Sequence, residues 1–192
     1  ETAQEQGDVH LSGLVKATLK PKSRDIQDSP YKVRTILDTG AGTNFICETI
    51  LPHIKHEYLA TKTLNVTGIN ATENKNMKLV KVFIENEFSQ DLQIKCYTIP
   101  SMINFNINEE NLEKFYKQFI DSCAFEGISM PQVIADHGKG IGLVLGPGTI
   151  RDISMSNPKY INEYLVDFTI FGPAISGRLP SGGPDNTAMN AI

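Results

Sequence analysis

One acidic residue of the chain, Asp38, has surroundings that make it a candidate for chemistry. It follows an apolar run and precedes Thr39 and Gly40. An ionised carboxylate is seldom placed at the end of a buried strand without partners, because losing its hydration costs free energy. Gly40 permits a close approach of backbone to the acid. Asp38 is therefore the candidate catalytic residue, and Thr39, Gly40 and Ala41 are the candidates for holding its geometry.

The chemistry that such a residue could perform needs a second carboxylate. Two carboxylates that face each other share one proton: one activates water for attack on a peptide carbonyl, and the other donates a proton to the carbonyl oxygen. The chain has 192 residues and contains the Asp-Thr-Gly triplet once. The second carboxylate would come from a second copy of Asp38, which predicts a homodimer.

The elements that must position Asp38 are mostly predicted strands. Short apolar runs and apolar-polar alternation, bounded by Gly and Pro, are typical of strands. These patterns predict strands at 9–19, 31–37, 44–47, 61–66, 77–84, 88–99, 143–145 and 165–171. The polar, glycine-bearing segment between the fourth and fifth of these runs predicts a β-hairpin. Asp38 is expected directly after the second strand.

Two segments predict helix. Residues 48–58 predict a short helix broken near Pro52. Residues 108–125 predict one amphipathic helix, with Asn108 as its N-cap. Its apolar residues fall on one face: Leu112, Phe115, Tyr116, Phe119 and Ile120. We interpret this face as core packing rather than as a cofactor site.

Three segments resemble a known family. The string Leu37-Asp38-Thr39-Gly40-Ala41, followed by 44–46, resembles the active-site segment of retropepsins, which are aspartic proteases. Residues 143–146 are similar to the apolar-Gly segment that supports the active-site loop in that fold. Residues 169–178 resemble the C-terminal signature of proteases of BEL/Pao-type retrotransposons. The resemblance spans residues 9–178, with an insertion at about 101–142 that contains the predicted helix.

The resemblance implies a fold and an activity. The fold would be mainly β, a retropepsin-like closed β-barrel with a flap hairpin and one inserted amphipathic helix. The activity would be that of an aspartic endopeptidase that cleaves peptide bonds in a polyprotein or a host protein. Its active site would be assembled by homodimerisation, with one Asp38 from each chain.

The resemblance also implies further site residues. The backbone of Gly68, Ile69 and Asn70 would form the flap tip and hydrogen-bond to a bound peptide, and Leu145 and Gly146 would form a second loop. The chain departs from the family at one point. Retropepsins usually follow the apolar-Gly segment with an Arg or an acidic residue that opens a helix, whereas here residues 147–148 are Pro-Gly.

Two other functions remain open. A domesticated retropepsin fold could dimerise and bind a protein partner without cleaving it, because fold does not settle function. The Pro-Gly departure and the insertion favour this binding module, whereas the intact Asp-Thr-Gly triplet favours the protease. In a third interpretation, the chain is a monomeric scaffold in which Asp38 caps its own loop.

The composition excludes several classes of partner. The net charge of −4 and the pI near 5.6 leave no basic excess, so nucleic acid is not predicted as a ligand. No apolar stretch approaches the roughly 20 residues that cross a bilayer, so no membrane partner is predicted. Cys47, Cys96 and Cys123 lack paired spacing and predict free thiols in a reducing compartment, cytoplasmic or nuclear.

No metal or cofactor is predicted. His53 and His56 would share one face of a helix, but no Cys or acidic cluster completes a metal site, so we expect both to be exposed. Asp136 and His137 are interpreted as loop residues. The glycines of 138–148 lack the Lys-Ser/Thr ending of a phosphate-binding loop. Residues 1–8 and 179–192 are expected to be flexible, and the N-terminal segment is interpreted as a cut from a longer chain without a secretion signal.

Overall fold

The computed structural model describes residues 9–23, 30–67, 72–86, 88, 91–100, 110, 112–114, 116–117, 119, 121 and 140–179. These residues form one sheet of ten strands in the order β4-β5-β6-β3-β7-β2-β1-β10-β9-β8. The strands are β1 Val9–Leu19, β2 Tyr31–Leu37, β3 Phe45–Cys47, β4 His56–Thr67, β5 Thr72–Phe83, β6 Gln93–Ile99, β7 Leu143–Leu145, β8 Lys159–Ile161, β9 Tyr164–Thr169 and β10 Gly172–Leu179. A 3-10 helix, η2, spans Glu48–His53, and an α-helix, α2, spans Pro147–Ile153.

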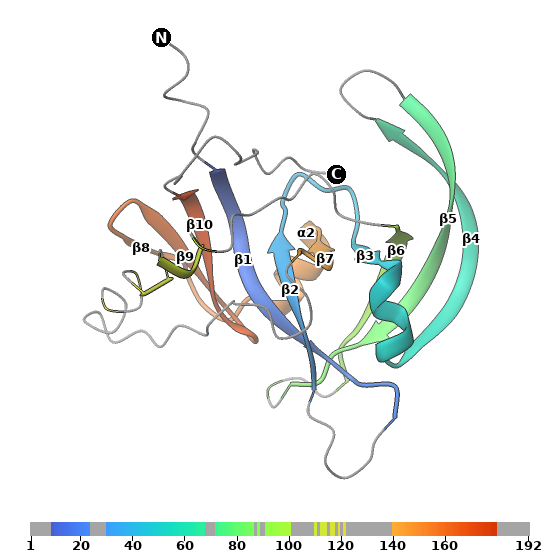
Figure 1. Ribbon diagram of the computed structural model, residues 1–192, viewed down its shortest axis with the longest axis horizontal. Helices are drawn as coiled ribbons and strands as arrows, with labels where there is room; N and C mark the ends of the chain where they lie inside the picture. The colour runs from blue at the N-terminus through green and yellow to red at the C-terminus, as the bar shows by residue number, and fades with distance from the viewer. Residues whose placement is uncertain are drawn as a thin grey trace.

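The fold is mainly β, as predicted, but the ten-stranded sheet does not close into the expected barrel. Figure 1 shows β4 and β5 as a long curved hairpin on one side of the molecule and β8, β9 and β10 on the other. The two outermost strands, β4 and β8, pair only with β5 and β9 respectively among the residues that the structure describes. The sheet is nevertheless curled, since Leu19 at the end of β1 forms an isolated bridge with Ile84, directly after β5.

Strands β3, β7 and β2 lie side by side at the centre of the sheet. β7 runs parallel to β2, with Leu145 opposite Leu37, and antiparallel to β3, with Val144 opposite Phe45. β3 in turn runs parallel to β6. All three residues of β7 are fully buried, which agrees with its purely apolar sequence. The strand that follows Asp38 is therefore separated from the strand that precedes it by β7.

Most of the predicted strands are confirmed. Strands β1, β2 and β7 have the predicted bounds, and the hairpin is present. The hairpin is longer than predicted: β4 and β5 pair from His56 opposite Val82 to Thr67 opposite Thr72. Its polar residues form a regular ladder because backbone hydrogen bonds, not apolar side chains, hold a hairpin that extends beyond the core.

The short helix predicted at 48–58 is present, but it is shorter than predicted. It is the 3-10 helix η2, which ends at His53, and β4 begins at His56. Pro52 lies inside the helix and has no N–H to donate, so a longer α-helix is not favoured there. His53 and His56 are both exposed, as predicted, and the ring of His53 stacks on that of Tyr31 at 5.6 Å.

The C-terminal part contains more strand than predicted. The strand expected at 165–171 is β9, which ends at Thr169, and a further strand, β10, follows at Gly172–Leu179, where no strand was predicted. The sequence pattern was misleading because Gly172 and Gly177 resemble strand breakers. They instead adopt positive φ of 103° and 149° within β10, which glycine does at little cost. The short strand β8 was not predicted.

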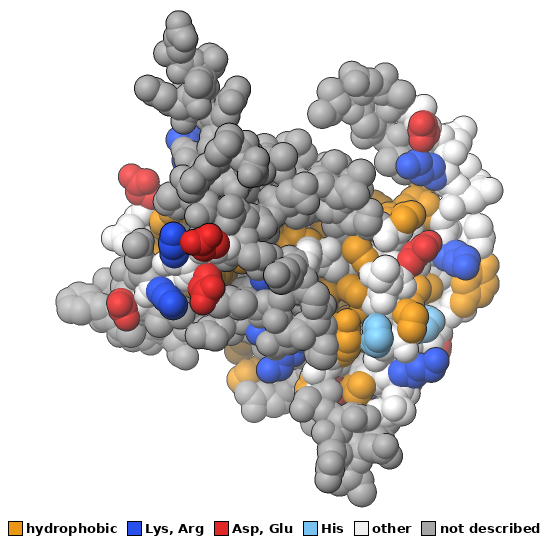
Figure 2. All heavy atoms as spheres, viewed as in Figure 1, with side chains coloured by type: hydrophobic (Ala, Val, Ile, Leu, Met, Phe, Trp, Pro, Cys, Tyr) orange, Lys and Arg blue, Asp and Glu red, His pale blue; other side chains and the backbone are white. Residues whose placement is uncertain are grey.

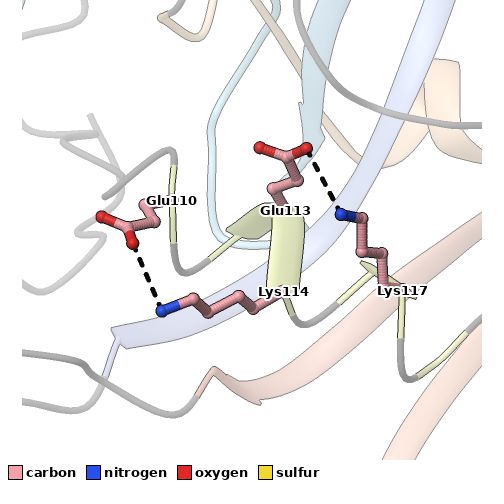
Figure 3. A network of polar contacts seen from close by, with 4 residues as sticks. All are labelled: Glu110, Glu113, Lys114 and Lys117. Atoms are coloured by element: carbon pink, nitrogen blue, oxygen red, sulfur yellow. Dashed lines mark ion pairs between the residues drawn. The ribbon is translucent and has the colours of Figure 1, made fainter.

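Helical residues of the insertion pack onto β9. Residues 110, 112–114, 116–117, 119 and 121 are helical, within the predicted helix. Leu112, Tyr116 and Phe119 are at most 3% exposed, and the Phe119 ring meets the edge of Tyr164 at 5.2 Å. On the outer face, two ion pairs join Glu110 to Lys114 and Glu113 to Lys117, and the partners of each pair are one helical turn apart (Figure 3). The interpretation of the aromatic face as core packing is confirmed for these three residues.

The surface of the described residues shows no concentration of one charge. Figure 2 shows Lys and Arg side chains interspersed with Asp and Glu, and apolar side chains at the surface over the β4–β5 hairpin. The exposed apolar residues there include Tyr58, at 59%, and Leu59, at 37%. None of the helices in the described ranges has the length and apolar character of a membrane span.

Candidate functional site

Asp38 lies directly after β2, as predicted, and its loop folds back onto it. Its carboxylate oxygen Oδ1 accepts a hydrogen bond from the backbone N–H of Gly40 at 2.8 Å. Its carbonyl oxygen accepts a second from the N–H of Ala41 at 3.2 Å. The side chain of Asp38 is fixed by its own loop, because an accepted backbone hydrogen bond favours one orientation of the carboxylate.

The structure places the supporting residues in two different environments. Thr39 and Gly40 are exposed at the turn, whereas Ala41 is 3% exposed and belongs to the core. Asp38 itself is 8% exposed. The loop therefore presents a largely buried acid next to an accessible backbone turn, which is where a second molecule could approach it.

Strand β1 contacts the end of β2, the strand that precedes Asp38. The hydroxyl of Ser12 donates to the carbonyl oxygen of Leu37 at 3.2 Å. Gly13 adopts a φ of +56°, and a Cβ added there would lie 2.7 Å from the Cβ of Leu37. β1 has a register shift at this point in its pairing with β10. Only glycine fits this contact, because a side chain would collide with Leu37, the residue before Asp38.

The predicted second loop, Leu145 and Gly146, does lie against the Asp38 loop. The N–H of Asp38 donates to the carbonyl oxygen of Leu145 at 2.9 Å. A Cβ added to Gly146 would lie 3.1 Å from the carbonyl oxygen of Thr43 and 3.3 Å from that of Ala41. The end of β7 and the Asp38 loop are thus in backbone contact, and a side chain at position 146 would be tight against this loop.

The Pro-Gly departure does not interrupt the helix that follows. Helix α2 begins at Pro147, directly after Gly146. Proline is favoured at the first position of a helix, since the N–H that it lacks would have no partner within the helix and its fixed φ is already helical. A helix therefore follows the apolar-Gly segment although residues 147–148 depart from the family pattern.

One residue of the site, Asn44, was given no role by sequence reasoning. It is 9% exposed and is among the few buried polar side chains of the described residues. Its Oδ1 accepts from the N–H of Gly146 at 2.8 Å, and its Nδ2 donates to the hydroxyl of Thr149 at 2.8 Å and to the carbonyl oxygen of Lys95 at 3.0 Å. The signal in the sequence is weak, because Asn between a glycine-rich loop and a strand is usually an exposed turn residue.

Several predicted residues lie outside the described residues. These are the flap-tip residues Gly68, Ile69 and Asn70, the pair Asp136 and His137, and Cys123. The strands β4 and β5 that lead to residues 68–71 are described and paired.

The remaining chemistry-bearing groups of the described residues do not form a second site. Cys47 and Cys96 are both buried thiols, and the Sγ of Cys47 donates to the carbonyl oxygen of Ile141 at 3.6 Å. Burial raises the pKa of the Cys96 thiol, which disfavours the reactive thiolate. Within the described ranges, no group of three or more His, Cys, Asp or Glu side chains could hold a metal ion. Asp38 and its loop are therefore the arrangement on which chemistry can be argued.

Comparison of the chain with known protein families, with curated proteins and with solved structures finds no match.

Proposed function

We propose that this chain is a retropepsin-like aspartic endopeptidase that acts as a homodimer, with one Asp38 from each chain. The observation that carries the proposal is the way in which the Asp38 loop is held. A largely buried carboxylate follows a buried strand, and the paired apolar-Gly segment clamps its backbone through the Asp38–Leu145 hydrogen bond.

The sequence motif and the spatial arrangement support the proposal independently. The Leu-Asp-Thr-Gly-Ala string and the Leu-Val-Leu-Gly string are about a hundred residues apart, and β2 and β7 bring them together in parallel register, with Leu37 opposite Leu145. Two carboxylates from two chains would share one proton, and the pair would titrate as a unit. Cleavage is then expected to be fastest at mildly acidic pH.

A binding module is the second candidate, and the β4–β5 hairpin favours it. β4 is an outer strand of the sheet and carries the exposed residues Tyr58 and Leu59. Exposed strand edges accept extended peptides by strand addition. In this function the chain would bind a protein partner through the hairpin, and Asp38 would have no catalytic role.

The Asp38→Asn variant separates the two functions. Asparagine keeps the oxygen that accepts the Gly40 N–H but cannot share or transfer the proton, so peptide cleavage should fall by about 10⁴-fold or more while the fold is retained. The measurement is cleavage of a diverse peptide library by both proteins between about pH 4 and 7, which brackets the carboxyl pKa range. A wild-type protein that cleaves no peptide, or a variant that cleaves as well as wild type, would contradict the protease.

A further inference from the structure

The buried side chain of Asn44 uses its full set of polar groups on three separate segments. Its oxygen accepts from Gly146, and its nitrogen donates to Thr149 and to the carbonyl oxygen of Lys95. Its own carbonyl oxygen accepts from the N–H of Tyr97 at 2.9 Å. The loop after β2, the start of α2 and strand β6 are thereby joined at one residue.

The position requires an amide in particular. The Gly146 N–H can only donate and the Lys95 carbonyl can only accept, so the residue between them must accept and donate at once. A carboxylate of the same size would lose both donated hydrogen bonds and face the carbonyl oxygen of Lys95 with like charge, and this repulsion would also weaken its hydrogen bond from the Gly146 N–H. A hydrophobic residue would leave all three partners without this contact.

Asn44 also completes a clamp whose other half is Asp38 itself. At the start of the loop, the N–H of Asp38 donates to the carbonyl oxygen of Leu145. At the end of the loop, the side-chain oxygen of Asn44 accepts from the N–H of Gly146, the residue after Leu145. Both ends of the segment 38–44 are thus fixed to consecutive residues at the end of β7. A Cβ added at Gly146 would come close to the carbonyl oxygens of Ala41 and Thr43, so the end of β7 faces this segment through a residue without a side chain.

We propose that Asn44 is the positioning residue of the active site, which holds the Asp38 loop on β7 so that the two carboxylates of a dimer can meet. The inference rests on the proposed protease function. Without the side chain of Asn44, the end of the loop would still be held by the backbone hydrogen bond from Tyr97, but its link to Gly146 would be lost. Since misplacement of a reacting group by about 1 Å can cost 10²-fold in rate, loss of the clamp should act on the chemical step.

The test compares Asn44→Asp with Asn157→Asp, which makes the same charge change at an exposed residue far along the chain. For a peptide substrate, Asn44→Asp should lower kcat by about 100-fold. KM should change by no more than about twofold, because the subsites for the rest of the peptide are not altered. Asn157→Asp should match wild type. A folded Asn44→Asp protein with the kcat of Asn157→Asp would overturn the assignment, as would a loss confined to KM.

Amide hydrogen exchange keeps the inference testable if the wild-type protein cleaves nothing. That result would remove the proposed function but not the clamp. Exchange at the amides of Asp38 and Gly146 should then still be faster in Asn44→Asp than in Asn157→Asp, and equal exchange would overturn the clamp. If Asn44→Asp does not fold, Thr149→Val removes one partner only. It should lower kcat by a smaller factor at unchanged KM, and a wild-type kcat in that variant would overturn the inference.

Discussion

Burial affects individual carboxyl groups differently, and Asp167 shows its cost. This residue lies in β9, opposite Ala174 of β10, and burial raises the pKa of its carboxyl group from the ordinary value of 3.8. Desolvation penalises the ionised form, so the folded protein holds the proton to higher pH than the unfolded chain does. This group therefore costs no stability below pH 3.8, where it is neutral in both states. As pH rises through the folded pKa, the free energy of unfolding falls.

Asp167→Asn should therefore make the protein more stable at pH 7, because asparagine carries no charge to desolvate. The gain should shrink as pH falls towards and below 3.8, where the wild-type carboxyl group is neutral in both states. Urea unfolding of both proteins at several pH values measures this difference. Asp91→Asn, at an exposed residue, serves as the control. A gain that is as large at acidic pH as at neutral pH would contradict the burial explanation.

At the scale of elements, the sequence predicted best the strands whose apolar residues are buried. β7 is a continuous apolar run before Gly146, β2 has an alternating pattern that ends in Ile36 and Leu37, and both strands have the predicted bounds. Their meeting could be expected only from the family resemblance, since no local pattern states which strands pair. The placement of Asp38 next to Leu145 follows from that pairing.

The elements that were mispredicted share a physical cause, which is that tertiary contacts decided them. β10 contains glycines at positive φ and a proline, yet it lies between β1 and β9, and both neighbours supply its hydrogen bonds. The role of Asn44 was hidden for the same reason: its three side-chain partners are 51, 102 and 105 residues away along the chain.

Glycines that resemble each other in sequence should respond oppositely to substitution. Gly13→Ala places a Cβ 2.7 Å from that of Leu37 at a φ of +56°, so we expect a loss of about 1–3 kcal/mol in the free energy of unfolding. Gly148→Ala, in α2, meets no atom within 4 Å and should gain about 0.4–1 kcal/mol. Chemical denaturation of both variants measures the two signs. Equal effects would show that the Gly13 contact relaxes freely.

At the scale of the whole molecule, the sheet limits how two chains can join. β1 pairs with β2 and β10, and β10 pairs with β1 and β9, so the hydrogen-bonding edges of both strands are used within one chain. Strand exchange through these segments would break existing pairs. Thr39, Gly40 and Gly42, in contrast, are exposed beside the buried Asp38. The proposed dimer is therefore expected to form its contact at the Asp38 loop.

Mixing wild-type protein with Asp38→Asn protein tests the shared site directly. If each active site needs one Asp38 from each chain, only dimers of two wild-type chains cleave peptide, and their share is the square of the wild-type fraction when chains exchange freely. Cleavage at constant wild-type concentration should therefore fall as the variant is added. The control is added Asn157→Asp protein, which has an intact Asp38 and should raise cleavage. Sedimentation on the same mixtures establishes that both variants associate. If activity stays constant while Asp38→Asn is added and associates, each chain works alone, and the shared pair of carboxylates would have to be abandoned.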